Sequence, residues 1–228
     1  KLFVITKFII QYFILKNYFF LNGYRHLFFK SDVDKRFVDN TTFEELYSMF
    51  LFDRSLRNIF FKNLLVIENN LKSITSYQLS KKYGYRERDY LKPKNFNNSP
   101  ERQKQVNDLI GKMKRQVRVN GSQHTATSHY LSNYGYIPLW VMVKVLSFGI
   151  VSEMFSILKE EDQLAISEVY DVSVDDIITC LPVLANYRNL CAHEDILFEN
   201  KTQKYIDDTI FHKLLNIEKT NDEYIYGK

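Results

Sequence analysis

The sequence of 228 residues contains few of the residues that break or turn a chain, with only 7 Gly and 4 Pro. A β-sandwich or β-barrel of this length requires many turns, which Gly and Pro usually supply. Few chain breakers between long apolar-periodic stretches indicate helices instead. Hydrophobic residues make up 45% of the chain, which excludes a disordered protein. We therefore predict an all-α fold and a single domain over 1–228.

Cysteine is also scarce, and the two cysteines, Cys180 and Cys191, fall in one predicted helical stretch. Neither has a cysteine or histidine partner at metal-ligand spacing, which argues against a disulfide scaffold and a zinc site. We expect both thiols to be small buried hydrophobic groups in a reducing cytoplasm. We expect no metal and no cofactor.

Long uncharged runs are missing too, although the N-terminal residues 1–24 are strongly apolar. Lys7 and Lys16 interrupt this segment, and the uncharged run Phe8–Leu15 is far shorter than the roughly 18 residues of a membrane span. No small-residue cleavage site follows, as a signal peptide would require. We expect a core helix over 3–20, no membrane partner and a cytoplasmic location. A membrane-acting toxin that uses this segment is a weaker alternative.

A capping box opens the longest apolar-periodic stretch of the chain. Thr42 is followed three positions later by Glu45, so each side chain can bond the backbone near the other. The stretch continues to Gly84, a residue that commonly follows a helix. More than 40 residues is long for one globular helix, so we expect a break near Phe52–Asp53.

The remaining chain is predicted to contain a loop and five more helices. Pro138 favours the start of one helix, Ser173 caps another, and Pro182 should kink that helix. His124 and His129 are expected in a loop rich in Ser and Thr. The loop is expected over about 85–99, and the helices over about 100–119, 139–158, 160–170, 173–193 and 202–217.

Positive charge is concentrated in residues 81–118, which contain 12 Lys and Arg but only 4 Asp and Glu. Residues 119–228 contain 8 basic and 16 acidic residues instead. We expect a basic helical excursion over about 85–120, in a weakly apolar helix that lies on the surface. Such a stretch can attract RNA, although an ordinary solvated helix face fits equally well. The candidate RNA-binding residues are Lys112, Lys114, Arg115 and Arg118, with Tyr83, Tyr85 and Tyr90 nearby for base stacking.

The predicted helix over 173–193 separates an apolar stripe from a polar one. Helical spacing aligns Pro182, Asn186, Asn189 and His193 on a polar face. Arg188 lies roughly 140° around the axis from His193, at one edge of the core. It continues the row that Ile177, Leu181 and Leu184 begin. The stripe expected to face the core contains Cys180, Leu184, Tyr187 and Cys191.

An arginine and a histidine can cleave RNA because RNA supplies its own nucleophile, the 2′-hydroxyl. Histidine titrates near neutrality, so it can remove that proton or protonate the leaving oxygen. Arginine can bind the phosphate and stabilise its developing charge. One histidine can hardly make both transfers at once, whereas two copies across a twofold axis can.

The spacing of Arg188 and His193 alone is a weak pattern. Arg188 could instead pair with a buried carboxylate, while His193 acts as a favourable cation at a helix C-terminus.

Several segments in order raise the specificity of this pattern. Residues Asn186–His193 read NYRNLCAH and resemble the RNxCAH signature of the abortive-infection (Abi) proteins of the AbiD/AbiF type, in the HEPN superfamily. The resemblance covers roughly 18–199. Its other segments are Phe20–Arg25, Thr41–Leu46, Phe52–Arg57, Val66–Leu71, Pro138–Val141 and Leu146–Gly149.

The resemblance implies a HEPN-like helical bundle with additional helices and defence against bacteriophage by RNA cleavage or toxicity. It implies that Arg188, Asn189 and His193 are catalytic, in a homodimer that cleaves RNA without metal. Asn186 is a supporting polar residue. Glu68 matches an acidic family position and would orient Arg188 or His193, or form only a structural ion pair. Some relatives are controlled by a structured non-coding antitoxin RNA, which is a further possible partner.

The sequence departs from the family pattern directly after His193. Where relatives often have polar and basic residues, this chain has Glu194 and Asp195. These charges either disfavour the approach of RNA from this side or favour the protonated form of His193. The leading hypothesis is a metal-independent endoribonuclease toxin. The alternative is a HEPN-like protein that binds RNA without cutting it.

Overall fold

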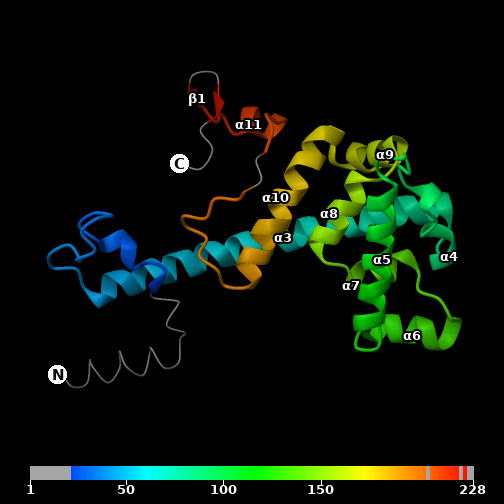
Figure 1. Ribbon diagram of the computed structural model, residues 1–228, viewed down its shortest axis with the longest axis horizontal. Coiled ribbons are helices and arrows are strands. Elements are labelled where there is room, and N and C mark those ends of the chain that lie inside the picture. The colour runs from blue at the N-terminus through cyan, green and yellow to red at the C-terminus, as the bar shows by residue number, and fades with distance from the viewer. Residues whose placement is uncertain (1–21, 204–205, 221–222, 225–228) are drawn as a thin grey trace. The chain divides into compact units, whose positions relative to one another are not determined.

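The computed structural model describes residues 22–203, 206–220 and 223–224 (Figure 1). In this part of the chain nearly all regular structure is helical, which confirms the all-α prediction. The strands β1 (Lys219–Thr220) and β2 (Glu223–Tyr224) form one short antiparallel hairpin. The helix expected over 3–20 lies outside the described residues. The helices are η1 (Arg25–Phe28), α3 (Phe43–Tyr83), α4 (Glu87–Tyr90), η2 (Pro93–Asn95), α5 (Gln103–Asn120), α6 (Thr125–Tyr134), α7 (Leu139–Val145), α8 (Phe148–Ser156), α9 (Glu160–Tyr170), α10 (Val174–Ala192) and α11 (Ile210–Leu214).

The chain divides into two compact units. The smaller unit consists of Lys1–Phe61 and Leu190–Asn200, and the larger unit of Lys62–Asn189 and Lys201–Lys228. The helices α3 and α10, cyan and gold in Figure 1, each contribute residues to both units. A single domain over 1–228 stays a prediction.

The long helix α3 runs unbroken for 41 residues, so the prediction of a break near Phe52–Asp53 was wrong. The predicted capping box is confirmed: the Glu45 amide donates to Thr42 Oγ1 at 3.2 Å, and the Thr42 amide donates to Glu45 Oε2 at 2.8 Å. Gly84 ends the helix with a φ of +93°. The length is tolerated because the two parts of α3 pack in different units.

The core of the larger unit is built around α5, which we had expected on the surface. Four apolar residues of α5 are almost fully buried, so the expectation of a surface helix holds only for its exposed basic face. They are spaced three or four positions apart, which gathers them on one face while the lysines and arginines occupy the other. These residues are Val106, Leu109, Ile110 and Met113, and they share one hydrophobic cluster with Phe148 and Phe155 of α8.

The helix expected over 139–158 is divided into α7 and α8. Leu146 is extended, with a ψ of 139°, and Ser147 then caps α8 by accepting a hydrogen bond from the Ile150 amide at 3.3 Å. A serine cap satisfies an amide that the start of a helix leaves unpaired, so a new helix starts here. The sequence signal for this break is Ser147, a residue type that favours the N-cap position.

The segment around His124 and His129 is also helical, not the predicted loop. His124 is the N-cap of α6 and accepts a hydrogen bond from the Thr127 amide at 3.4 Å. His129 lies on α6 itself. Gly135 ends the helix in the left-handed conformation, with a φ of +72°.

The last helices agree with the sequence in part. The spans of α9 and α10 confirm the predictions over 160–170 and 173–193 to within a residue or so, and the Asp176 amide donates to the Ser173 cap at 3.0 Å. The final helix was predicted over 202–217, but α11 covers only Ile210–Leu214. No helix among the described residues is long and apolar enough to cross a membrane.

The burial of α5 gives a direct stability test. Leu109→Ala leaves a cavity in the core of the larger unit and should lower the free energy of unfolding by about 2–5 kcal/mol. Lys104→Ala on the exposed face of the same helix should change it by less than about 0.5 kcal/mol. Denaturant unfolding followed by circular dichroism measures both. Equal effects of the two substitutions would contradict the core position of α5.

Candidate functional site

Arg188 continues the buried row of α10. Ile177, Leu181 and Ala185 of that row are buried, and the side chain of Arg188 is 26% exposed. The core stripe predicted for this helix was partly wrong. The row that is buried contains Ile177 and Ala185, which lie beside the predicted stripe on the helix surface. Of the predicted stripe only Cys191 is buried, whereas Cys180, Leu184 and Tyr187 are half-buried.

A buried carboxylate of α3 holds Arg188. Arg188 Nε donates to Glu68 Oε2 at 2.8 Å, and Lys72 Nζ donates to Glu68 Oε1 at 2.6 Å. Glu68 and Lys72 are both almost completely buried. Burial lowers the pKa of Lys72, while its bond to Glu68 opposes that shift. The single carboxylate therefore pairs with two cations, one from its own helix and one from α10.

The geometry leaves the outer part of the Arg188 guanidinium available. Its Nε is engaged by Glu68, while Nη1 lies 3.4 Å from Asn189 Oδ1. Asn186 and Asn189 are exposed, as the predicted polar face requires. A guanidinium fixed at Nε can still present both terminal nitrogens to an anion, in the forked geometry that suits phosphate.

His193 lies directly after the last residue of α10 and is exposed. The Asp195 amide donates to the Leu190 carbonyl at 3.1 Å, and the Glu194 amide to the Cys191 carbonyl at 3.4 Å. Glu194 is left-handed, with a φ of +59°. This pattern is a Schellman motif, which closes the helix and makes His193 its C-cap residue. The boundary between the two units falls between Asn189 and Leu190, so His193 belongs to the smaller unit.

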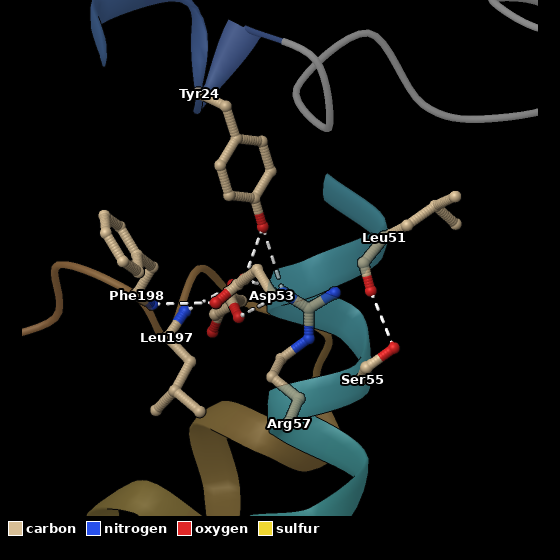
Figure 2. A network of polar contacts seen from close by, with 8 residues as sticks. Tyr24, Leu51, Asp53, Ser55, Arg57, Leu197 and Phe198 are labelled. Atoms are coloured by element: carbon tan, nitrogen blue, oxygen red, sulfur yellow. Dashed lines mark hydrogen bonds and ion pairs between the residues drawn. The ribbon is translucent and has the colours of Figure 1, made fainter. Parts of the chain in front are cut away.

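The chain after His193 is tied to a buried aspartate of the smaller unit, shown in Figure 2. Asp53 is completely buried. Its Oδ1 accepts from the Phe198 amide at 2.8 Å, and its Oδ2 accepts from the Leu197 amide at 3.2 Å and from the Tyr24 hydroxyl at 2.5 Å. Arg57, one turn along α3, completes the set as an ion-pair partner. The carboxylate thus has partners for its full hydrogen-bonding capacity.

Arg57 links this network to the turn itself. Its Nη1 donates to the Asp195 carbonyl at 3.2 Å and contacts the Tyr24 hydroxyl at 3.1 Å. Burial, with the hydrogen bond to Asp53 second, raises the pKa of the Tyr24 phenol well above its usual range, so the phenol remains a donor. The network fixes the backbone that follows His193. Sequence reasoning missed it, although the spacing of Asp53 and Arg57 on one helix face was a usable signal.

The predicted RNA-binding residues of α5 are only partly available. Lys112 pairs with Glu153 at 2.7 Å. Lys114, Arg115 and Arg118 are exposed and form no ion pair with any described residue. Of the tyrosines expected to stack bases, Tyr90 is buried and Tyr83 donates to Asp162 at 2.6 Å, while Tyr85 is exposed.

Neither thiol is placed as a nucleophile. Burial, with the charge of Asp176 second, raises the pKa of Cys180 to about 11, and burial raises the pKa of Cys191. Deprotonated thiolate is therefore scarce at neutral pH. No group of three or more His, Cys, Asp and Glu side chains among the described residues is arranged to hold a metal ion.

A pocket of about 840 Å³ lies at α9 and the start of α10 and contains none of the motif residues. Its lining includes Glu160, Glu168, Asp171, Asp175 and Asp176, a set of charges that repels an anionic ligand.

Comparison with known proteins gives a family match. The family described as "Abi-like protein" matches residues 14–199, which include α3 through α10. No curated protein and no solved structure matches the chain.

The Asp53 network predicts a local and a global effect of one substitution. Asp53→Asn leaves Arg57 buried without its countercharge, which should cost about 3–5 kcal/mol of stability. Amide hydrogen exchange at Leu197 and Phe198 should accelerate, because their acceptor is weakened. The matched control is Asp34→Asn, which removes a solvent-screened ion pair with exposed Arg36 and should leave the stability close to that of the wild type. Unchanged exchange at Leu197 and Phe198 would show that Asp53 does not hold this segment.

Proposed function

The chain belongs to the Abi-like protein family, and from that premise we propose that it is an RNA-cleaving protein of bacteriophage defence. The family description points to abortive infection, in which an infected cell stops supporting the phage. Within this role, we assign RNA cleavage to Arg188, Asn189 and His193.

One observation carries the proposal. Arg188 is the sole cation of the motif, and buried Glu68 holds its Nε while its Nη1 donates to Oδ1 of exposed Asn189 at 3.4 Å. An arginine that is fixed at one edge and open at the other suits a phosphodiester that arrives from solvent.

The proposed reaction uses the RNA's own hydroxyl. His193 removes the 2′-hydroxyl proton, the 2′-oxygen attacks phosphorus, and the bond from phosphorus to the 5′-oxygen breaks. The leaving oxygen takes up a proton, so the products are a 2′,3′-cyclic phosphate and a 5′-hydroxyl. Arg188 stabilises the charge that develops on the phosphate, and Asn189 orients it.

The two proton transfers favour a homodimer. One transfer needs a base and the other an acid, and a single His193 can supply only one of them in a single step. A twofold pair of chains would supply two copies of the motif to one phosphodiester. An antitoxin RNA would bind the same motif residues as the substrate. A structured RNA bound there would prevent substrate RNA from reaching them.

Glu194 and Asp195 bear on the alternative of RNA binding without cleavage. Their backbones close α10, with Glu194 left-handed and the Asp195 carbonyl bonded to Arg57. These backbone contacts explain why the chain turns here, but they do not explain why both residues have acidic side chains. The negative charge beside His193 weakens the affinity for RNA at this point, so a protein that acted by binding alone would gain nothing from it.

The proposal predicts that His193→Ala abolishes cleavage. Removing a general acid or base should slow cleavage of total or transfer RNA in EDTA by about 100-fold or more. Arg188→Ala should have a comparable effect. The products of the wild-type protein should end in a 2′,3′-cyclic phosphate, which mass spectrometry identifies.

Two substitutions outside the motif are matched controls for this experiment. His26→Ala removes an exposed histidine whose Nε2 lies 2.5 Å from Glu199, and Arg54→Ala removes an exposed arginine of α3. Both should cleave at the wild-type rate. Equal cleavage by wild type and His193→Ala, or cleavage only with added divalent metal, would refute the proposal. Full phage restriction by both motif variants would favour the binding protein.

A further inference from the structure

A second pocket lies in the larger unit, on residues that the motif does not use. It has a volume of about 480 Å³, within the range of small-molecule and nucleotide sites. Three cations line it, Arg86, Arg88 and Lys114, against the single acid Glu87. The lining also includes Tyr134 and Tyr136.

Exposed aromatic rings continue from the pocket across the surface. Tyr85 lies 5.7 Å from Tyr136 and 6.0 Å from Trp140 between ring centroids, and Tyr136 lies 6.2 Å from Tyr134. Tyr85, Tyr134 and Trp140 are each 42–57% exposed. Large rings seldom remain this accessible in a contiguous group unless they contact a partner. We refer to Tyr85, Tyr134, Tyr136 and Trp140 as the aromatic platform.

Two hydrogen bonds fix the backbone next to Tyr136, one ring of the platform. The Ile137 amide donates to the Glu87 carboxylate, and the Ile137 carbonyl accepts from the hydroxyl of buried Tyr90 at 2.8 Å. Both backbone groups next to Tyr136 are therefore fixed to α4. The bond to Ile137 also occupies the one acidic side chain of the pocket. Preorganised rings lose little conformational freedom when a ligand stacks on them.

The cations differ in their availability. Arg86 lies over the rings of Tyr85 and Tyr136, at 5.8 and 5.1 Å from their centroids, so it stabilises the platform. Arg88 and Lys114 are exposed, and neither forms an ion pair with any residue that the structure describes. They are free to bind an anion at the edge of the rings.

We propose that this pocket and the aromatic platform bind single-stranded nucleic acid, with bases stacked on the exposed rings and phosphates held by Arg88 and Lys114. Flat rings beside unpaired cations match the alternation of base and phosphate along a single strand. Bases in a duplex are already stacked on each other, so a duplex cannot use the rings. The choice of RNA over DNA as the natural ligand rests on the proposed function; the binding site itself does not.

The platform contains the single tryptophan of the chain, Trp140, so its intrinsic fluorescence reports on this site. The experiment titrates the His193→Ala protein with an eight-nucleotide oligoadenylate, as RNA and as DNA, and with a duplex of the same length. Both single strands should quench Trp140 in a saturable manner, and the duplex should bind at least 10-fold more weakly. The His193→Ala background prevents cleavage, so the result does not depend on catalysis.

Substitutions at two positions locate the binding. Tyr134→Ala should weaken binding of the single strand by about 5- to 150-fold, the range for one lost base–aromatic stack, while Tyr134→Phe keeps the ring and should bind normally. Arg88→Ala should weaken binding and reduce the slope of log affinity against log salt by about 0.7, as expected for one phosphate contact. The controls are Tyr77→Ala, another exposed tyrosine, and Lys104→Ala on α5.

Several results would overturn this inference. The first is binding of single strands without any change in Trp140 fluorescence, and the second is a duplex that binds as tightly as a single strand. The third is equal affinity of Tyr134→Ala and Tyr77→Ala, with both proteins folded by circular dichroism. A failure of the wild-type protein to cleave RNA would leave these titrations unaffected, so the two proposals can fail separately.

Discussion

The bond between Glu68 and Arg188 is the interaction on which the rest of the account depends. It pairs an almost fully buried carboxylate, which would cost several kcal/mol if it were unpaired, with a guanidinium whose side chain is 26% exposed. Lys72 shares the carboxylate, so the site holds two cations against one anion. Because this leaves positive charge in excess, the accessible nitrogens of Arg188 favour an anion from solvent. A structural contact and a phosphate-binding role are thus compatible in one side chain.

The same long helix supplies a second buried acid in the smaller unit. Asp53 fixes the backbone of Leu197 and Phe198, and Arg57 bonds the carbonyl of Asp195. In the larger unit, Glu68 therefore holds Arg188. In the smaller unit, Asp53 and Arg57 hold the turn that follows His193.

Local signals in the sequence predicted local structure well. The capping box at Thr42, the Ser173 cap and the Gly84 terminus depend only on neighbouring residues, and the structure contains all three. The errors concern tertiary packing. Helix α3 exceeds the usual length because two units support it. The apolar face of α5 is buried although few of its residues are apolar. The position of Arg188 at the edge of the core followed from its helical row, whereas burial of Asp53 and Arg57 cannot be read from a polar pair alone.

A double-mutant cycle on RNA cleavage tests most directly whether Glu68 acts through Arg188. The rates of wild type, Glu68→Gln, Arg188→Ala and the double variant are compared, with Lys72→Met as a control for loss of the other bond to Glu68. We predict that Glu68→Gln slows cleavage by about 10-fold or more in the wild-type background and has no further effect once Arg188 is absent. The same slowing in both backgrounds, or no slowing in either, would contradict the account.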